Sequence, residues 1–158
     1  LDDFDSADVG AAQIDRLFFA NADVVFGAGG LTGSGAILEA ASRGLFVIGV
    51  DQDEYFTTFD GGAIDGSDLV ITSALKRVNV GVYDMVSALL EENFDAFPGG
   101  ENYVLSTENG GISFANTHEA AVSDEVIQQV IMVEEALAVG ELSTGVDPAS
   151  GELLSDEE

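Results

Sequence analysis

Cysteine is absent from the 158-residue sequence, which excludes disulfides, thiolate metal sites and cysteine nucleophiles. No apolar run approaches the ~18 to 20 residues that a membrane-spanning helix needs, so no such helix is expected. The sequence also lacks an initiator methionine and a signal-like segment at its start, Leu1. We therefore expect the chain to belong to something longer, with any export signal or lipid anchor upstream.

Basic residues are also scarce. Lysine and arginine together number 4 against 30 acidic residues, which gives a formal net charge of −26. Such a surface repels nucleic acid phosphates and anionic lipid head groups, so nucleic acid is not expected as a partner. Disorder is disfavoured because 46% of the residues are hydrophobic and they are strongly patterned. The composition indicates a folded, halophilic domain, because screening over ~3 Å at 1 M salt removes most of the self-repulsion.

Helical and strand-like patterns alternate along the chain. Apolar residues at helical spacing predict helices at residues 7–20, 34–43, 74–92 and 124–139. Short apolar runs predict strands at residues 23–26, 45–50, 68–72, 103–106 and 112–115. Residues 27–35 (GAGGLTGSG) are too rich in glycine for either element, so a tight loop is expected there. Residues 140–158 lose this periodicity and are predicted to form a mobile acidic tail.

This alternation predicts an α/β fold, a Rossmann-like, mostly parallel sheet with helices on both faces. Ligands of such sheets bind outside the carboxyl ends of the strands. That rule selects residues 26–35, 51–54 and 72–76. We expect these three segments to converge on one edge of the sheet.

The glycine-rich loop before a helix has more than one interpretation. Its backbone N–H groups could hold a ligand, or its glycines could simply permit close packing. The spacing of Gly29, Gly33 and Gly35 also fits short-chain dehydrogenases, with Asp51 placed to bind a ribose hydroxyl. Those enzymes need a tyrosine four residues before a lysine, but the only lysine, Lys76, has a threonine there. An oxidoreductase would therefore lack its acid–base pair.

Catalysis and metal binding find little support elsewhere in the sequence. His118 is the only histidine and lies in a polar segment, so it is expected to be a solvated surface residue rather than a base. Asp51, Asp53 and Glu54 could hold a hard cation weakly. The many carboxylates are better explained by solvation, so no metal site is expected.

Four runs in series resemble the basic membrane protein family of substrate-binding lipoproteins. They are ADVVFGAGGLTGSGAILEAA, FVIGVDQD, ITSALKRVNVGVYDMV and YVLSTENGGISFA. The family includes purine nucleoside receptors of ABC importers, so the resemblance implies a type I periplasmic binding protein with a nucleoside between two lobes. Residues 1–139 resemble the C-terminal lobe with its hinge-proximal segments, and the N-terminal lobe is missing. The sequence departs from the family between Glu54 and Asp68, where a longer loop carries Phe56 and Phe59.

The resemblance also implies a ligand site. Phe26 would stack on the base, and Phe4 is a weaker candidate for the same role. Asp51 would accept hydrogen bonds from ribose hydroxyls, while Lys76 would donate to ribose oxygens and orient Asp51. Three residues would let the backbone approach the ligand closely: Gly30, Thr32 and Gly33.

The implied function is that of the substrate-binding component of an ABC importer. Such a protein binds its nucleoside without catalysis or cofactor, and closure of the lobes signals the membrane permease. The implied location is extracytoplasmic, at the cell surface, through the upstream lipid anchor. Two alternatives stay open: a nucleotide-dependent oxidoreductase that uses the loop from Gly29 to Gly35, and a binding lobe with a sensory role or a sugar-like ligand.

Overall fold

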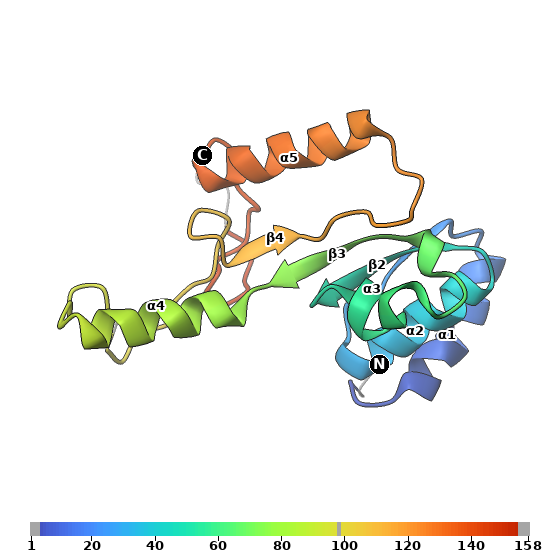
Figure 1. Ribbon diagram of the computed structural model, residues 1–158, viewed down its shortest axis with the longest axis horizontal. Coiled ribbons are helices and arrows are strands. Elements are labelled where there is room, and N and C mark those ends of the chain that lie inside the picture. The colour runs from blue at the N-terminus through green and yellow to red at the C-terminus, as the bar shows by residue number, and fades with distance from the viewer. Residues whose placement is uncertain (1–3, 98, 155–158) are drawn as a thin grey trace. The chain divides into compact units, whose positions relative to one another are not determined.

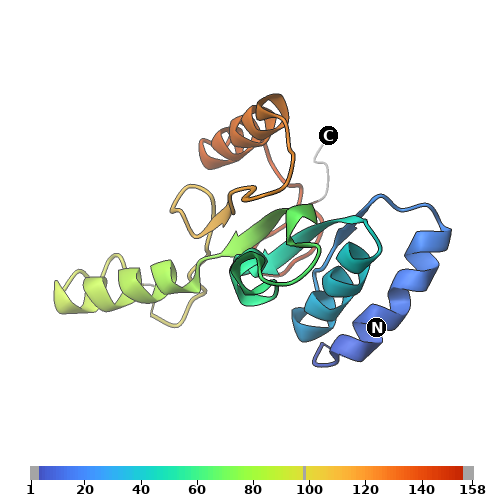
Figure 2. The ribbon, with the colours of Figure 1, turned by 45° about the vertical axis from the view of Figure 1, so that its right-hand side comes forward.

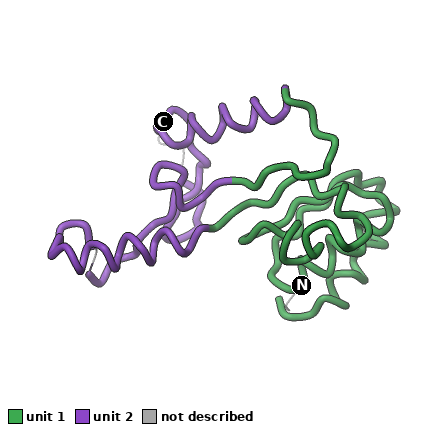
Figure 3. The backbone as a smooth tube through the Cα atoms, viewed as in Figure 1, with its two compact units in different colours: residues 1–76, 114–124 green, residues 77–113, 125–158 purple. Residues whose placement is uncertain are grey.

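The computed structural model describes residues 4–97 and 99–154 (Figure 1, and turned in Figure 2). The chain divides into two compact units, coloured separately in Figure 3. Unit 1 comprises residues 1–76 and 114–124, and unit 2 comprises residues 77–113 and 125–158. The chain therefore passes from one unit to the other three times.

Unit 1 confirms the predicted α/β fold. Strands β1 (Val24–Phe26), β2 (Phe46–Asp51) and β3 (Val70–Lys76) pair in parallel. The mixed sheet has the order β1-β2-β3-β4, and its last strand, β4 (Ile112–Phe114), begins in unit 2 and ends in unit 1. Helices α1 (Ala7–Phe19) and α2 (Gly30–Ser42) lie side by side, and α2 packs against β1 and β2 (Figure 2).

The glycine-rich loop is shorter than predicted, because α2 already begins at Gly30. Close packing explains the small residues. A Cβ at Gly33 would overlap the carbonyl oxygen of Gly27, and a Cβ at Gly35 would overlap the backbone of Ala7. Gly30 has a φ of +56°, in the left-handed region that favours glycine. These glycines let α2 approach both the end of β1 and the start of α1.

The segment between β2 and β3, predicted as one long loop, folds into short helical pieces. They are α3 (Glu54–Thr57) and two 3₁₀ turns, Asp60–Gly62 and Ser67–Leu69. Phe59 is 0% exposed and belongs to the hydrophobic core, whereas Phe56 is 59% exposed. The rest of this core is Ile14, Val25, Ile37, Ala40, Ala41, Leu45, Val47, Tyr55 and Val70. The loop is therefore anchored in the core through Tyr55 and Phe59.

The two sides of β1 and β2 differ in burial. Val25 and Val47 pair with each other and lie in the core, where they are 5% and 0% exposed. Successive side chains of a strand point to opposite faces. Val24, Phe26 and Phe46 therefore lie on the other face, where they are 40%, 54% and 39% exposed. Phe26 thus stands on an open side of the sheet.

Strand β3 extends to Lys76, so helix α4 (Val78–Leu90) begins later than the predicted helix at residues 74–92. The reason is pairing with the neighbouring strand, which continues in register as far as Asp51 and Leu75. Tertiary pairing of this kind overrides local helical spacing. Lys76 consequently ends a strand rather than beginning a helix.

In unit 2 the helix α5 (Asp124–Ala138) agrees with the prediction, but the predicted strand at residues 103–106 is wrong. The Asn109 side chain forms hydrogen bonds with backbone groups that would otherwise pair with a neighbouring strand. Its Nδ2 donates to the carbonyl of Val104 at 2.9 Å, and its Oδ1 accepts the amide of Ser106 at 2.9 Å. The segment is therefore an irregular loop closed by one asparagine.

The final described segment is a hydrogen-bonded turn without helix or strand. Asp147 accepts the amides of Ser150 and Ala149 at 2.7 Å and 3.0 Å, and these bonds lower the pKa of its carboxyl. Val146 and Leu153 form an isolated antiparallel bridge around it. Residues 155–158 of the predicted tail lie outside the described residues.

Across residues 4–97 and 99–154, every helix is too short or too polar to cross a membrane.

Candidate functional site

Asp51 and Lys76 meet at the carboxyl edge of the parallel sheet. Their strands are neighbours, and Asp51 pairs in register with the residue before Lys76. The Oδ1 of Asp51 lies 2.7 Å from the Nζ of Lys76. The two side chains are 46% and 53% exposed, so the pair is accessible to a ligand. An exposed ion pair adds only ~0 to 1 kcal/mol to stability, so its main effect is to present an oriented carboxylate and ammonium.

The backbone at Asp51 is strained. Its φ is +67°, a conformation that costs a residue with a Cβ about 1 to 3 kcal/mol. The amide of Gln52 donates to the carbonyl of Val50 at 2.8 Å, which closes a three-residue γ-turn around Asp51. Strain of this kind gathers at ligand-binding sites, where the surroundings hold it in place.

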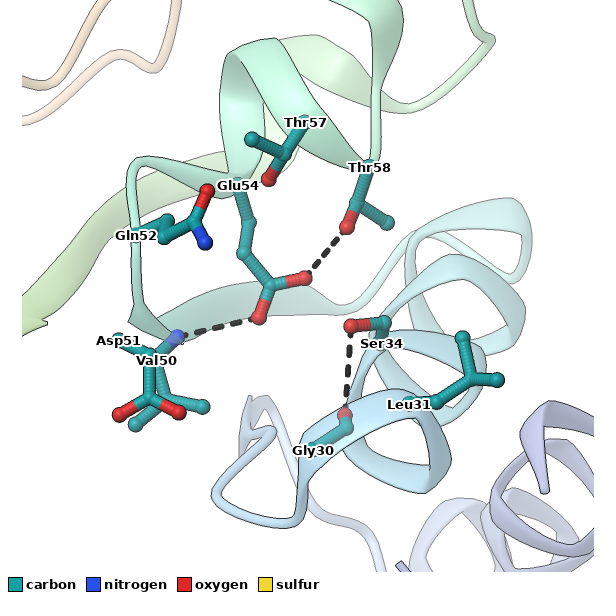
Figure 4. A pocket seen from close by; sticks show the side chains of 9 residues that line it. All are labelled: Gly30, Leu31, Ser34, Val50, Asp51, Gln52, Glu54, Thr57 and Thr58. Carbon is teal, nitrogen blue, oxygen red and sulfur yellow. Dashed lines mark hydrogen bonds between the residues drawn. The ribbon is translucent and has the colours of Figure 1, made fainter. Parts of the chain in front are cut away.

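A cavity of about 270 Å³ opens beside this turn, and Figure 4 shows it from close by. It lies between the end of β2, the first turns of α2, and α3, all in unit 1. Two of the predicted site residues, Gly30 and Asp51, line it. The other lining residues are Leu31, Ser34, Val50, Gln52, Glu54, Thr57 and Thr58. Its volume lies just below the ~300 Å³ at which small-molecule pockets begin.

Glu54 forms a buried wall of this cavity. It is 3% exposed, and both oxygens of its carboxylate are engaged (Figure 4). Oε1 accepts the amide of Val50 at 3.1 Å, and Oε2 accepts the hydroxyl of Thr58 at 2.6 Å. The amide of Glu54 donates to the Oγ of Ser73 at 3.0 Å, and Ser73 is itself 0% exposed. Sequence reasoning missed this structural role, because Val50 and Thr58 are near in sequence but their bonds to the carboxylate depend on how β2 ends and α3 begins.

The other carboxylates near this edge have separate partners. Asp51 pairs with Lys76, whereas the Oδ2 of Asp53 lies 2.7 Å from the Nε2 of His118. His118 also stacks on Tyr55, with ring centroids 4.1 Å apart and an interplanar angle of 16°, and its side chain is only 17% exposed. As a whole, His118 is an exposed residue, as expected, but its ring is held by Asp53 and Tyr55 rather than being fully solvated. Within the described ranges, no group of three histidine, cysteine or acidic residues is arranged to hold a metal ion.

Burial and a nearby carboxylate raise the pKa of Tyr55, whose ring stacks on His118. Tyr55 is 8% exposed, and desolvation raises the pKa of its hydroxyl above the ordinary value. The charge of Glu119 raises this pKa further, and Ser67 donates to the same carboxylate at 3.2 Å. The segment that carries His118 and Glu119 is thus fixed to α3 by polar and aromatic contacts.

The remaining predicted site residues gather around a different hollow. Phe26, Thr32 and Gly33 line a space of about 150 Å³ beside α1 and α2. Thr32 is 3% exposed, and its Oγ1 accepts the amide of Ser6, the N-cap of α1, at 3.1 Å. Phe4 is 65% exposed, and its carbonyl accepts the amide of Thr32 at 3.1 Å. These four predicted residues therefore do not line the cavity in Figure 4.

Comparison with known proteins relates most of the chain to one family. A family model for PnrA-like ABC transporter substrate-binding proteins matches residues 1–146. The chain is 28% identical to a CD4+ T-cell-stimulating antigen of Listeria monocytogenes, over 92% of this chain and 42% of that protein. It is 24% identical to basic membrane protein D of Borreliella burgdorferi, over 90% of this chain and 40% of that protein. The chain thus spans about two fifths of the length of these relatives.

Solved structures agree with the fold. A transcriptional activator of the comK gene from Bacillus halodurans superposes with a TM-score of 0.75 at 18% identity, over 91% of this chain and 46% of that one. An ABC transporter solute-binding protein from Conexibacter woesei gives a TM-score of 0.57 at 21% identity, over 96% and 45%. At these identities the likeness establishes the fold alone. Since the family model spans nearly the entire sequence, this chain belongs to the Bmp family of PnrA-like ABC transporter substrate-binding proteins.

Proposed function

We propose that this chain is the C-terminal lobe of an ABC importer receptor and binds a purine nucleoside without catalysing a reaction. The observation that carries the proposal is the exposed Asp51–Lys76 ion pair at the carboxyl edge of the sheet, beside a cavity that Asp51 lines. Parallel α/β sheets bind their ligands at this edge. Family membership supports the receptor role, and the resemblance of the runs around both residues to nucleoside receptors supports the ligand.

The pair offers the groups that a ribose needs. A carboxylate accepts hydrogen bonds from hydroxyls, and these bonds are stronger than those between neutral groups. The ammonium of Lys76 has three hydrogens, and one is enough for its contact with Asp51. The hydroxyls of Ser34 and Thr57 on the cavity wall add polar partners. Phe26 lies outside this cavity, on the open side of the sheet, and in our proposal its exposed ring stacks on the part of the base that extends beyond the cavity.

A second lobe completes this site in our proposal. Pockets for small molecules bury ~70 to 90% of the ligand, which a cavity with a half-exposed ion pair at its rim cannot do alone. The chain spans 42% of its Listeria relative, which leaves room for another lobe of similar size. In unit 2, Val78, Val82 and Val86 of α4 are 53%, 58% and 50% exposed, as expected for a helix whose apolar side packs against a partner.

The cellular role follows from the family. Closure of the two lobes on the nucleoside would present the receptor to its membrane permease. The receptor would work outside the cytoplasm, held at the membrane by a lipid anchor upstream of this chain. The net charge of −26 supports a surface adapted to concentrated salt.

A thermal-shift panel on the two-lobe receptor in concentrated salt tests this proposal. Binding to the native state stabilises it by RT ln(1 + [L]/Kd), about 2.7 kcal/mol when the ligand is at 100 times its Kd. We expect guanosine, inosine or adenosine to raise the unfolding temperature, and ribose, amino acids and NAD to leave it unchanged. A shift produced by NAD alone would support the oxidoreductase instead, and a shift produced only by sugars would replace the nucleoside as ligand.

A further inference from the structure

We propose that Glu54 is a positioning residue of the ligand site, because its buried carboxylate holds the strained turn that presents Asp51 to Lys76. The inference rests on the proposed function for its effect on nucleoside binding. Its structural part concerns the γ-turn alone and can be tested without any ligand.

The turn needs an external support. Asp51 has a φ of +67°, which is sparsely populated for a residue that carries a Cβ. The bond from the Gln52 amide to the Val50 carbonyl, at 2.8 Å, closes a γ-turn of a kind that is rare in proteins. A chain left to itself would relax out of this conformation, so neighbouring groups must fix it.

Glu54 supplies the acceptor that the sheet no longer offers. Strand β1 ends at Phe26, which pairs with Ile48, and the last bond on this side runs from the amide of Gly27 to the carbonyl of Ile48. The amide of Val50 points to the same side, beyond the end of β1, because strand residues two apart share an orientation. Oε1 of Glu54 accepts this amide at 3.1 Å and so takes the place of the missing strand.

Glu54 is in turn held rigidly. Thr58 donates to its Oε2 at 2.6 Å, and its own amide donates to Ser73 at 3.0 Å. Ser73 is 0% exposed and lies on β3, the strand that ends at Lys76. A Cβ on Gly49 would lie 2.5 Å from the Oγ of Ser73 and 2.8 Å from the Cβ of Glu54, so this contact is tight. One buried network therefore ties together the strand ends that carry Asp51 and Lys76.

Removing the carboxylate should release the turn. In Glu54→Ala the Val50 amide loses its acceptor, and Asp51 can leave its position beside Lys76. Glu54→Gln keeps an acceptor oxygen of the same reach, and its amide group can donate to Thr58. A positioning role therefore predicts that glutamine rescues the site and alanine does not. Glu39→Ala is the matched control, because Glu39 bonds Arg43 at 2.7 Å near the end of α2, outside the cavity.

The structural test uses NMR of the 158-residue chain in concentrated salt. Lys76 is the only lysine, so lysine labelled with ¹³C gives one side-chain system. We expect the two Hε protons of Lys76 to give separate signals in the wild type, Glu54→Gln and Glu39→Ala, and to merge in Glu54→Ala. Hydrogen exchange of the Val50 amide should accelerate by at least about tenfold in Glu54→Ala alone. Unchanged Lys76 signals and Val50 exchange in Glu54→Ala would overturn the inference, whatever the receptor binds.

The functional test measures guanosine affinity of the two-lobe receptor by calorimetry. Glu54→Ala should weaken binding about tenfold, while Glu54→Gln and Glu39→Ala stay within about threefold of the wild type. An equal loss in Glu54→Gln would show that the charge of Glu54 acts directly, and unchanged affinity in Glu54→Ala would show that the turn does not matter; either contradicts positioning. If the wild type binds no nucleoside, the proposed function fails, and NMR still decides the role of Glu54.

A second variant tests the same network in case Glu54→Ala does not fold. Thr58→Val keeps the shape of the threonine but removes the hydroxyl that holds Oε2. We expect faster Val50 exchange and a smaller loss of affinity, about threefold. A folded Thr58→Val protein with wild-type exchange at Val50 would contradict the proposed network.

Discussion

Phe59 should carry a large share of the stability of unit 1. It is among the largest side chains that the core encloses completely, at 0% exposure, although it comes from a segment that sequence patterns predicted to be a loop. Phenylalanine-to-alanine changes in such positions cost about 3 to 5 kcal/mol through lost burial and the cavity left behind. Domains of this size have a total stability of only ~5 to 15 kcal/mol. Phe59→Ala should therefore remove roughly a fifth or more of the stability and lower the unfolding temperature by roughly 6 to 20 °C.

Phe56→Ala provides the matched comparison, three residues earlier in the same segment. Phe56 is 59% exposed and makes edge contacts with Tyr55 and His118 at centroid distances of 5.2 Å and 5.0 Å. Its loss should cost only about 1 to 2 kcal/mol, because aromatic pairs contribute about 0.5 to 1.5 kcal/mol each and the ring is largely exposed. Urea unfolding in concentrated salt, followed by circular dichroism, measures both. Equal losses in the two variants would refute the assignment of Phe59 to the core.

Three further outcomes are expected. Lowering the salt from about 3 M to about 0.05 M should unfold the chain cooperatively, because the charge of −26 is then poorly screened; circular dichroism that ignores salt would remove the halophilic interpretation. In an alkaline titration at 295 nm, Tyr55→Phe should remove a tyrosinate signal that appears above the ordinary pKa, since burial and Glu119 raise the pKa of Tyr55. Because this folded-state pKa is raised, the stabilising contribution of Tyr55 is complete below the ordinary value of about 10 and declines as the pH rises through the folded-state value. The isolated 158-residue chain should bind nucleosides no better than about millimolar, and micromolar binding would contradict the need for a second lobe.

Regular patterns in the sequence predicted most of the scaffold. Residues 7–20 and 124–139 differ from α1 and α5 only at their ends, because their apolar spacing agrees with the structure that packing selects. The rule that ligands bind at the carboxyl ends of parallel strands selected residues 51–54 and 72–76, and the family resemblance singled out Asp51 and Lys76 within them. The structure places the Oδ1 of Asp51 2.7 Å from the Nζ of Lys76. The local sequence pattern was therefore sufficient to predict a residue's position where that position depends on a single helix or strand.

Contacts between distant segments could not be predicted in this way. His118 lies against Asp53 and Tyr55, and only the folded chain brings these residues together. Glu54 looked like one more solvated acid, because its burial depends on its contact with Ser73 of β3, nineteen residues away. The γ-turn at Asp51 was equally hidden, since the positive φ of a residue with a Cβ is imposed by its surroundings.

The interpretation as a nucleoside-binding lobe depends most directly on the ion pair at the sheet edge. Calorimetric titration of guanosine, inosine and adenosine into the two-lobe receptor should be repeated with Asp51→Ala and Lys76→Met. Each substitution removes a charge-assisted hydrogen bond worth about 1.5 to 3 kcal/mol, so each should weaken binding roughly ten- to a hundredfold. If both variants bind a nucleoside as tightly as the wild type, the ligand does not bind at this pair and the proposed site is wrong.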